Sequence, residues 1–236
     1  MKITAFSAAA LLGLALPAAA VEVTGGELSF SHSQFTDYSD VAKTTLEGAV
    51  EFGFTRSFSV QADLGFSALN ATDETVTAMA LHAIYHGDEH NSYGLFIGNE
   101  SVAGEDVTYY GIEFGHETGP LSLETFLARG EEEGVDGTEF GLKGRYAVTE
   151  RFGLGARYDT VDFDGVIDAT VLGLTADYAV VPNLLVTGEV GTAELAFDGL
   201  GSTSEPYVKL GATYKFGAGR GATFGKRGLV NLIPGA

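Results

Sequence analysis

The 236-residue chain has no cysteine and no tryptophan. The lack of cysteine excludes disulfides, a zinc–thiolate site, a redox pair and a cysteine nucleophile. Helical periodicity is almost absent, and after the first 20 residues no apolar run is long enough for a transmembrane helix. What is present is glycine (33 residues), phenylalanine (16) and tyrosine (10), with only 5 prolines. This composition is typical of a protein built from many short β-strands.

Positive charge is also scarce. The chain has 13 lysines and arginines against 32 aspartates and glutamates, a net charge of −19. A nucleic-acid partner needs a basic surface, so this class of partner is excluded. The acidic balance instead favours attraction of cations and keeps exposed loops soluble. No motif predicts a cofactor.

Residues 1–20 have the pattern of a secretory signal peptide. A short positive start at Lys2 precedes the apolar stretch "AFSAAALLGLALPAAA", which ends in small residues. The stretch is short for a membrane-spanning helix of ~20 residues. We therefore expect cleavage after Ala20 and export of residues 21–236 into the periplasm.

Period-2 alternation of apolar and polar residues recurs in twelve segments, each near the ~9–11 residues that a tilted strand needs to cross a bilayer. The segments lie near 27–35, 43–55, 58–68, 74–86, 91–99, 107–116, 120–129, 138–148, 151–160, 168–180, 183–194 and 205–216. The first and fifth segments are weak, so ten strands remain an alternative to twelve.

The connections between these segments are predicted to alternate in length. Short turns such as "TRS" at 55–57 and "VVPN" at 180–183 alternate with longer acidic loops such as "NESVAGED" at 99–106 and "RGEEEGVDG" at 129–137. Short turns at one rim and long loops at the other are typical of outer-membrane barrels. The fold class predicted for residues 21–216 is therefore all-β, a transmembrane antiparallel up-and-down β-barrel, most simply with 12 strands.

Alternation along the strands assigns charged residues to the inner face. An acidic wall is expected from Glu47, Glu51, Asp63, Glu113 and Glu124, and a basic wall from Lys143, Arg145, Arg157, Lys209 and Lys215. Opposed charges would orient dipolar solutes and filter ions in an open pore, or close the lumen through salt bridges. Inner-face glycines such as Gly115 would widen the lumen or allow the sheet to curve. In the fourth segment, Met79, Leu81 and Ala83 fall on the face expected to look inward.

No catalytic site is expected. None of the five histidines belongs to a serine–histidine–acid set, because adjacent residues of a strand point to opposite faces. One weak metal candidate is the segment "DTVDFDGVID", which resembles the start of an EF-hand loop but lacks its closing glutamate. Its acidic residues are Asp159, Asp162, Asp164 and Asp168. The plainer interpretation is an acidic loop that attracts divalent cations diffusely, without a dedicated site.

The signal peptide, the segment "LEGAVEFGFTRSFSVQADLGF" and the last strand "YVKLGATYKF" resemble alphaproteobacterial outer-membrane porins and porin-like barrels. The resemblance implies passive diffusion of small hydrophilic solutes and contact with outer-membrane lipid and lipopolysaccharide. Such porins are often trimers of 16-stranded barrels. This chain is too short for 16 strands and lacks a long constriction loop, so its oligomeric state is left open.

Residues 217–236 form a basic tail, with Arg220, Lys226 and Arg227 and no acidic residue. The tail is expected either to enter the lumen as a plug, to remain disordered in the periplasm, or to rest on the membrane surface. The function predicted for the whole is a porin-like channel that prefers cations. The alternatives are a non-conducting structural or adhesive barrel of the outer membrane and a soluble exported β-protein.

Overall fold

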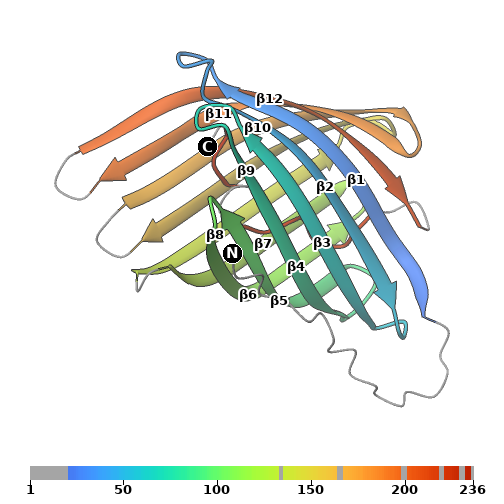
Figure 1. Cartoon of the computed structure of the whole chain (residues 1–236). Coiled ribbons are helices and arrows are strands. Elements are labelled where there is room, and N and C mark those ends of the chain that lie inside the picture. Colours follow the sequence, from blue (N-terminus) through green and yellow to red (C-terminus); the bar gives the residue numbers. More distant parts are fainter. Residues whose placement is uncertain are drawn as a thin grey trace.

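The computed structural model describes residues 21–132, 135–163, 167–197, 201–217, 221–228 and 232–234. The predicted signal peptide at 1–20 lies outside these residues. Among the described residues, no helix is long and apolar enough to cross a membrane. The chain forms twelve antiparallel strands that close into one barrel (Figure 1).

The strands follow one another around the barrel in chain order. They are β1 (Glu22–Phe35), β2 (Ala42–Gly53), β3 (Phe58–Leu69), β4 (Glu74–His86), β5 (Asn91–Val102), β6 (Glu105–Thr118), β7 (Leu121–Glu132), β8 (Val135–Ala147), β9 (Phe152–Phe163), β10 (Ile167–Val181), β11 (Leu184–Phe197) and β12 (Gly201–Phe216). Antiparallel pairing of β1 with β12, from Gly26 opposite Phe216 to Phe35 opposite Tyr207, closes the ring. The prediction of twelve strands is confirmed, and the ten-stranded alternative is wrong.

The predicted alternation in connection length is wrong for most of the barrel. The segment 36–41 is the longest connection, whereas β5 and β6 meet at a two-residue turn where an acidic loop was expected. In this turn Ala103 and Gly104 have φ angles of 53° and 93°, the left-handed pair that a tight hairpin of type I′ requires. The acidic segments continue the strands: Glu100 of β5 pairs with Val107 of β6, and its side chain is almost fully buried. What identifies the barrel is therefore the pairing of β1 with β12, and not the lengths of the connections.

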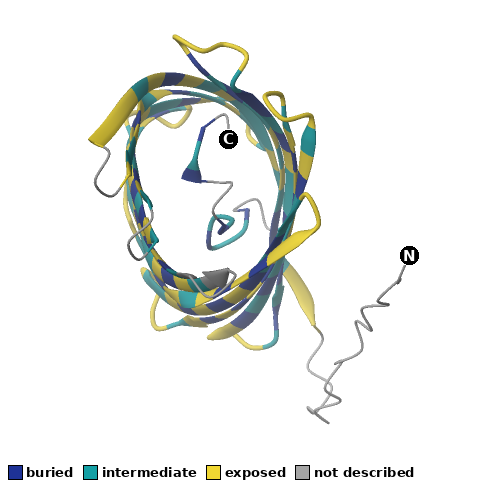
Figure 2. Cartoon of the chain, turned by 60° about the vertical axis from the view of Figure 1, so that its left-hand side comes forward, coloured by how far each residue is buried: buried dark blue, intermediate teal, exposed yellow. Residues whose placement is uncertain are grey.

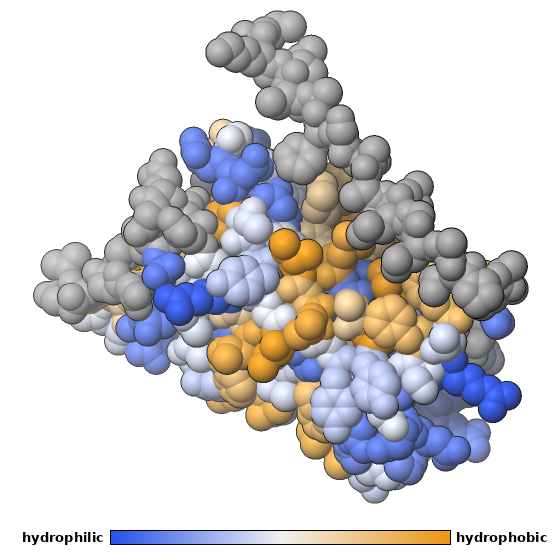
Figure 3. Space-filling view, turned by 90° about the horizontal axis from the view of Figure 1, so that it is seen from below, coloured by the Kyte–Doolittle hydropathy of each residue, from blue (hydrophilic) through white to orange (hydrophobic). Residues whose placement is uncertain are grey.

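The outer face of the barrel is apolar. Leu210 and Leu174 expose 69% and 64% of their surface there, and Figure 3 shows apolar side chains gathered between hydrophilic ends. An apolar outside with charged groups inside is the arrangement of an outer-membrane barrel, the reverse of a soluble protein.

The expected orientation of β4 is wrong. Met79 and Leu81 lie on the outside, because Met79 stands opposite the outward-facing Leu64 in the register of β3 and β4. Ala83 shares this outer face. Both faces of β4 carry apolar residues, since Ile84 is fully buried on the inner one, so alternation alone could not orient the strand.

The C-terminal segment lies inside the ring of strands (Figure 2). β1 begins and β12 ends at one rim, which we call the terminal rim. The tail begins there, with Gly221 against Gly25. Further along, Leu232 packs in an apolar cluster with Phe35 and Tyr207, which lie toward the opposite rim.

Candidate functional site

The five acidic residues predicted for one wall lie on the inner face of β2, β3, β6 and β7. Glu51, Asp63 and Glu113 are almost fully buried there, at 0%, 7% and 4% exposure. Glu47 lies against Gly65 of the neighbouring strand, and Glu124 borders the tail at Gly225. Strand alternation places all five together because each strand turns every second residue inward.

The five predicted basic residues also face inward, but acidic residues lie among them. The Arg145 guanidinium donates two hydrogen bonds of 2.7 Å to Asp177, and Arg157 pairs with Asp159 at 2.6 Å. Lys143 and Lys215 line a cavity near the terminal rim. The remaining residue of this wall, Lys209, lies on β12 opposite Glu189. The predicted basic wall therefore also contains carboxylates. The same alternation places them inside, but the prediction did not include them.

Two other inner-face residues were missed. Lys43 is 5% exposed on the wall that was expected to be acidic, and His82 is 1% exposed between apolar neighbours of β4. Sequence reasoning overlooked His82 because β4 had been oriented the wrong way round. With the correct orientation, the alternation itself would have placed His82 inside.

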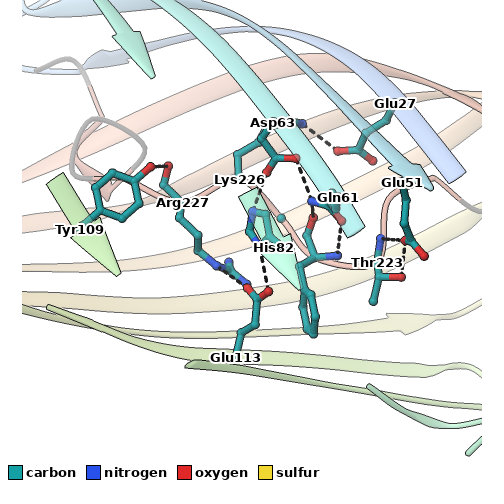
Figure 4. Close-up of polar contacts among 12 residues, drawn as sticks. Glu27, Glu51, Gln61, Asp63, His82, Tyr109, Glu113, Thr223, Lys226 and Arg227 are labelled. Atoms are coloured by element: carbon teal, nitrogen blue, oxygen red, sulfur yellow. Dashed lines mark hydrogen bonds and ion pairs between the residues drawn. The ribbon is translucent and has the colours of Figure 1, made fainter. Parts of the chain in front are cut away.

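The tail is first fixed by Glu51 and Gln61. Glu51 accepts hydrogen bonds from the Thr223 backbone N–H (3.0 Å) and hydroxyl (2.6 Å). The Gln61 side-chain amide donates to the Phe224 carbonyl at 2.8 Å and accepts from its N–H at 3.2 Å, so it pairs with the tail as a neighbouring strand would. Figure 4 shows these contacts.

The ring of Phe224 fills a recess in the wall and is 1% exposed. Two glycines form the floor: a Cβ on Gly94 would lie 2.8 Å from the ring, and one on Gly115 would lie 3.3 Å from it. His82 stacks beside the ring at 6.5 Å between centroids. Gly115 had been expected to widen the lumen or curve the sheet; here it makes room for a tail side chain.

Lys226 and Arg227 bring the positive charge of the tail to the wall. The Lys226 ammonium contacts Glu27 at 2.8 Å. The Arg227 guanidinium donates to Glu113 from Nε at 3.0 Å and from Nη2 at 2.7 Å, and its Nη1 lies 2.7 Å from Glu124. Arg227 is 4% exposed. A buried cation with two carboxylate partners is strongly held, because removal of either side would leave an unpaired charge.

Aromatic rings complete the surroundings of this guanidinium. Its Cζ lies 4.3 Å from the ring centroid of Phe126 and 5.6 Å from that of Phe96, within the range of cation–π contacts. We call Glu113, Glu124, Phe96 and Phe126 the guanidinium cage. The Tyr109 hydroxyl beside it donates to the Arg227 carbonyl at 3.0 Å, which fixes the backbone as well (Figure 4).

A chain of side chains orients the cage carboxylate of Glu113. His82 contacts Glu113 through Nδ1 at 2.8 Å and Asp63 through Nε2 at 3.1 Å. Gln61 donates to Asp63 at 2.9 Å. Among the described residues, no buried side-chain nitrogen or oxygen lacks a hydrogen-bond partner. The wall around the tail is therefore an ordered polar network.

The far end of the tail is held by two cations of the wall. Arg157 donates to the Leu232 carbonyl at 2.8 Å, and the Lys43 ammonium donates to the Ile233 carbonyl. Leu232 itself is 2% exposed in the apolar cluster. These contacts tie the end of the tail to β2 and β9.

Two cavities flank the tail. A vestibule of about 1050 Å³ opens at the terminal rim and reaches Phe224 and Glu124. A second cavity, of about 50 Å³, lies beyond Arg227. Glu124 and Lys143 line both.

In the rim turn, hydrogen bonds from the Asn91 side chain and the His90 N–H lower the pKa of the Asp88 carboxyl.

The weak metal candidate is not assembled. Asp159 pairs with Arg157 in the lumen, whereas Asp162 and Asp168 stand opposite each other and are exposed. Asp164 lies outside the described residues. Across the described part of the chain, no three potential ligands gather around one point.

Comparison with known proteins gives a fold but no family. No protein-family model matches the chain, and no curated protein matches it significantly. The KdgM porin matches with a TM-score of 0.59 and 12% identity, covering 80% of this chain and 99% of that one. The NanC porin matches with 0.60 and 10%, covering 80% and 100%. The outer-membrane channel COG4313 from Pseudomonas putida F1 matches with 0.52 and 15%, covering 85% and 97%.

Another of the similar structures is described as the KdgM porin in complex with disordered oligogalacturonate, at a TM-score of 0.58 and 13% identity over 80% of this chain and 99% of that one. At these identities the likeness concerns the fold. The similar structures are bacterial outer-membrane porins and channels, and this confirms the predicted fold class. The alphaproteobacterial part of the predicted resemblance is not supported by these structures.

Proposed function

We propose that the protein is an outer-membrane channel for small hydrophilic solutes or ions, and that it prefers cations. The observation that carries the proposal is the excess of carboxylates on the inner wall between the rims. The inner-face acids are Glu27, Glu47, Glu51, Asp63, Glu100, Glu113, Glu124, Glu139, Asp159, Asp177 and Glu189, against Lys43, Lys143, Arg145, Arg157, Lys209 and Lys215. A lumen with this sign lowers the energy of a cation and raises that of an anion.

The preferred solute of this protein would thus be positively charged, unlike the ligand named with one of the similar structures. Oligogalacturonate, named with the KdgM porin, is an anion. The acidic wall of this chain favours cations, so the shared fold would serve a different solute. This protein would be no enzyme, would lie in the outer membrane after export of residues 21–236, and would contact lipid and lipopolysaccharide. The resemblance to alphaproteobacterial porins rests on the sequence patterns alone.

We also propose that residues 217–236 plug the channel. Lys226 and Arg227 pair with three wall carboxylates, and Phe224 fills the recess between β5 and β6. With the tail in place, the vestibule that opens at the terminal rim is bordered by Thr223, Phe224 and Gly225 of the tail. Release of the tail would join the vestibule to the opposite half of the lumen.

A second candidate function is a non-conducting structural barrel of the outer membrane. The observation that favours it is the contact of residues 221–228 and 232–233 with the wall, which begins at Gly221 near the terminal rim and includes Leu232 near the opposite one. In this case the tail would be part of a permanent core, and the working surfaces would be the acidic strand ends.

Single-channel current in a planar bilayer under a salt gradient separates the two. Refolded full-length protein is compared with protein that lacks residues 217–236. Larger discrete steps after deletion, with a cation-selective reversal potential, would support the plugged channel. Absence of steps from both proteins, each shown by heat-modifiable migration to be folded, would favour the structural barrel. Anion selectivity would contradict the role given to the carboxylates.

A further inference from the structure

The surroundings of Arg227 form a complete recognition site for a planar cation. Glu113 receives two N–H groups of the guanidinium and Glu124 receives a third, at 2.7 to 3.0 Å. Phe126 lies over the group at 4.3 Å. The fork of donors and the stacked ring match a guanidinium better than an ammonium, which has no plane and no fork.

Almost every part of this site belongs to the barrel wall. Three adjacent strands supply the cage: Phe96 lies on β5, Glu113 on β6, and Glu124 and Phe126 on β7. The tail contributes the ring of Phe224, 5.9 Å from the guanidinium carbon, and the Gly225 N–H, which donates to Glu124 at 3.0 Å. The wall would therefore keep two carboxylates and two rings after the tail had left.

The wall also holds Glu113 and the two rings of the cage in place. His82 orients Glu113 from the side away from Arg227, at 2.8 Å. Phe96 packs edge-on against Phe126 and against Tyr109, with ring centroids 6.2 Å and 6.3 Å apart. These contacts do not involve the tail, so Glu113 and the two rings would remain preorganised for a cation in the empty cage.

We propose that the guanidinium cage is a binding site for small guanidinium-bearing solutes, which Arg227 occupies from within the same chain. Glu124 faces both the vestibule and the cavity beyond Arg227, so a solute that enters at the terminal rim reaches the cage directly. The inference rests on the proposed channel only in that the solute enters through the lumen. It narrows the solute class from cations in general to planar, hydrogen-bonding ones.

The test is equilibrium binding of methylguanidinium to the refolded full-length variant Arg227→Ala, measured by titration calorimetry in detergent. We expect a dissociation constant of about 1 mM or tighter, since small preorganised sites bind efficiently per atom. Methylammonium, with the same charge, is expected to bind roughly tenfold more weakly. The wild-type protein is expected to bind methylguanidinium at least roughly tenfold more weakly, because Arg227 fills its cage.

Two further substitutions in the Arg227→Ala background locate the site. Glu124→Gln removes a cage carboxylate and is expected to weaken binding roughly a hundredfold. Glu47→Gln, the matched control, removes a carboxylate of the same lumen outside the cage and is expected to leave binding almost unchanged. Equal effects of the two, or no binding by folded Arg227→Ala, would overturn the proposal. Arg227→Gln replaces the alanine variant if the latter does not fold.

Failure of this proposal is distinguishable from failure of the channel. Binding in detergent requires no ion flow. A barrel that binds methylguanidinium as the Arg227→Ala variant, but gives no current steps even without residues 217–236, would disprove the channel and retain the site. A barrel that conducts without binding would disprove the site alone.

Discussion

Truncation of Phe224 to alanine should release the tail while the barrel stays folded. The ring is 1% exposed and lies over Gly94 and Gly115 beside His82. Removal of a fully buried phenylalanine costs ~3–5 kcal/mol. Because no wall residue changes, this cost applies to docking of the tail and not to pairing of the strands. At ~1.4 kcal/mol per factor of ten, even the lower figure raises the undocked population roughly a hundredfold.

The absence of cysteine provides the assay. A single cysteine at Leu232, which is 2% exposed in the apolar cluster, can react with a bulky maleimide only when the tail leaves the lumen. Labelling rates of Leu232→Cys with and without Phe224→Ala are compared in folded protein. If docking is fast relative to labelling, the rate ratio equals the ratio of undocked populations, so an increase of roughly a hundredfold is expected.

The matched control is Phe66→Ala, the same truncation at a phenylalanine that is 45% exposed on the outer face. It should leave the labelling rate at Leu232→Cys almost unchanged. Equal labelling with and without Phe224→Ala would refute the reasoning, because the ring would then contribute nothing to docking. Loss of heat-modifiable migration in Phe224→Ala would refute it differently, by showing that the tail is needed for the barrel itself.

Three other results follow from the same geometry. Gly115→Val places a Cβ 3.3 Å from Phe224, its nearest neighbour, and should speed labelling as Phe224→Ala does. Gly48→Val, whose Cβ would meet its nearest atoms at 3.8 Å, should not. Lys226→Met removes the ion pair with Glu27, in which the Lys226 side chain is 10% exposed and that of Glu27 is 17% exposed. Docking of the tail should weaken by about 1.5–3 kcal/mol. Unchanged labelling at Leu232→Cys would contradict this. Leu210→Arg places a charge on the outer face. It should lower the free energy of unfolding in lipid by ~2–4 kcal/mol if the site lies at the bilayer midplane. The measurement is the fraction folded in lipid vesicles, and undiminished folding would argue against a lipid-facing surface there.

The sequence predicted the barrel because strand alternation is a local property. The alternation of Phe58, Val60 and Ala62 with polar residues, for instance, needs only its own strand to be recognised. Where both faces of a strand are apolar, as in β4, the pattern has no direction. Only the pairing of Leu64 with Met79 decides it, and that pairing is a contact between strands.

The connections were harder to predict because charge does not end a strand. The turn at Ala103 and Gly104 lies inside a segment whose glutamates suggested a loop. In a soluble sheet such residues would mark the surface. In this barrel they continue the hydrogen-bonded ladder, and only the left-handed turn residues show where the chain reverses.

The position of the tail follows from the charge that the barrel encloses. Each strand alone offers one or two inner carboxylates, but closure of the ring places many of them in a narrow space where they repel one another. Arg227 relieves this repulsion between Glu113 and Glu124, and Lys226 does the same at Glu27. Sequence separations of 100 to 200 residues hide this relation, although the opposite signs of barrel and tail are visible in composition. A cation from solution that meets the same two carboxylates competes with Arg227, so the charge that holds the tail also selects the solute able to displace it.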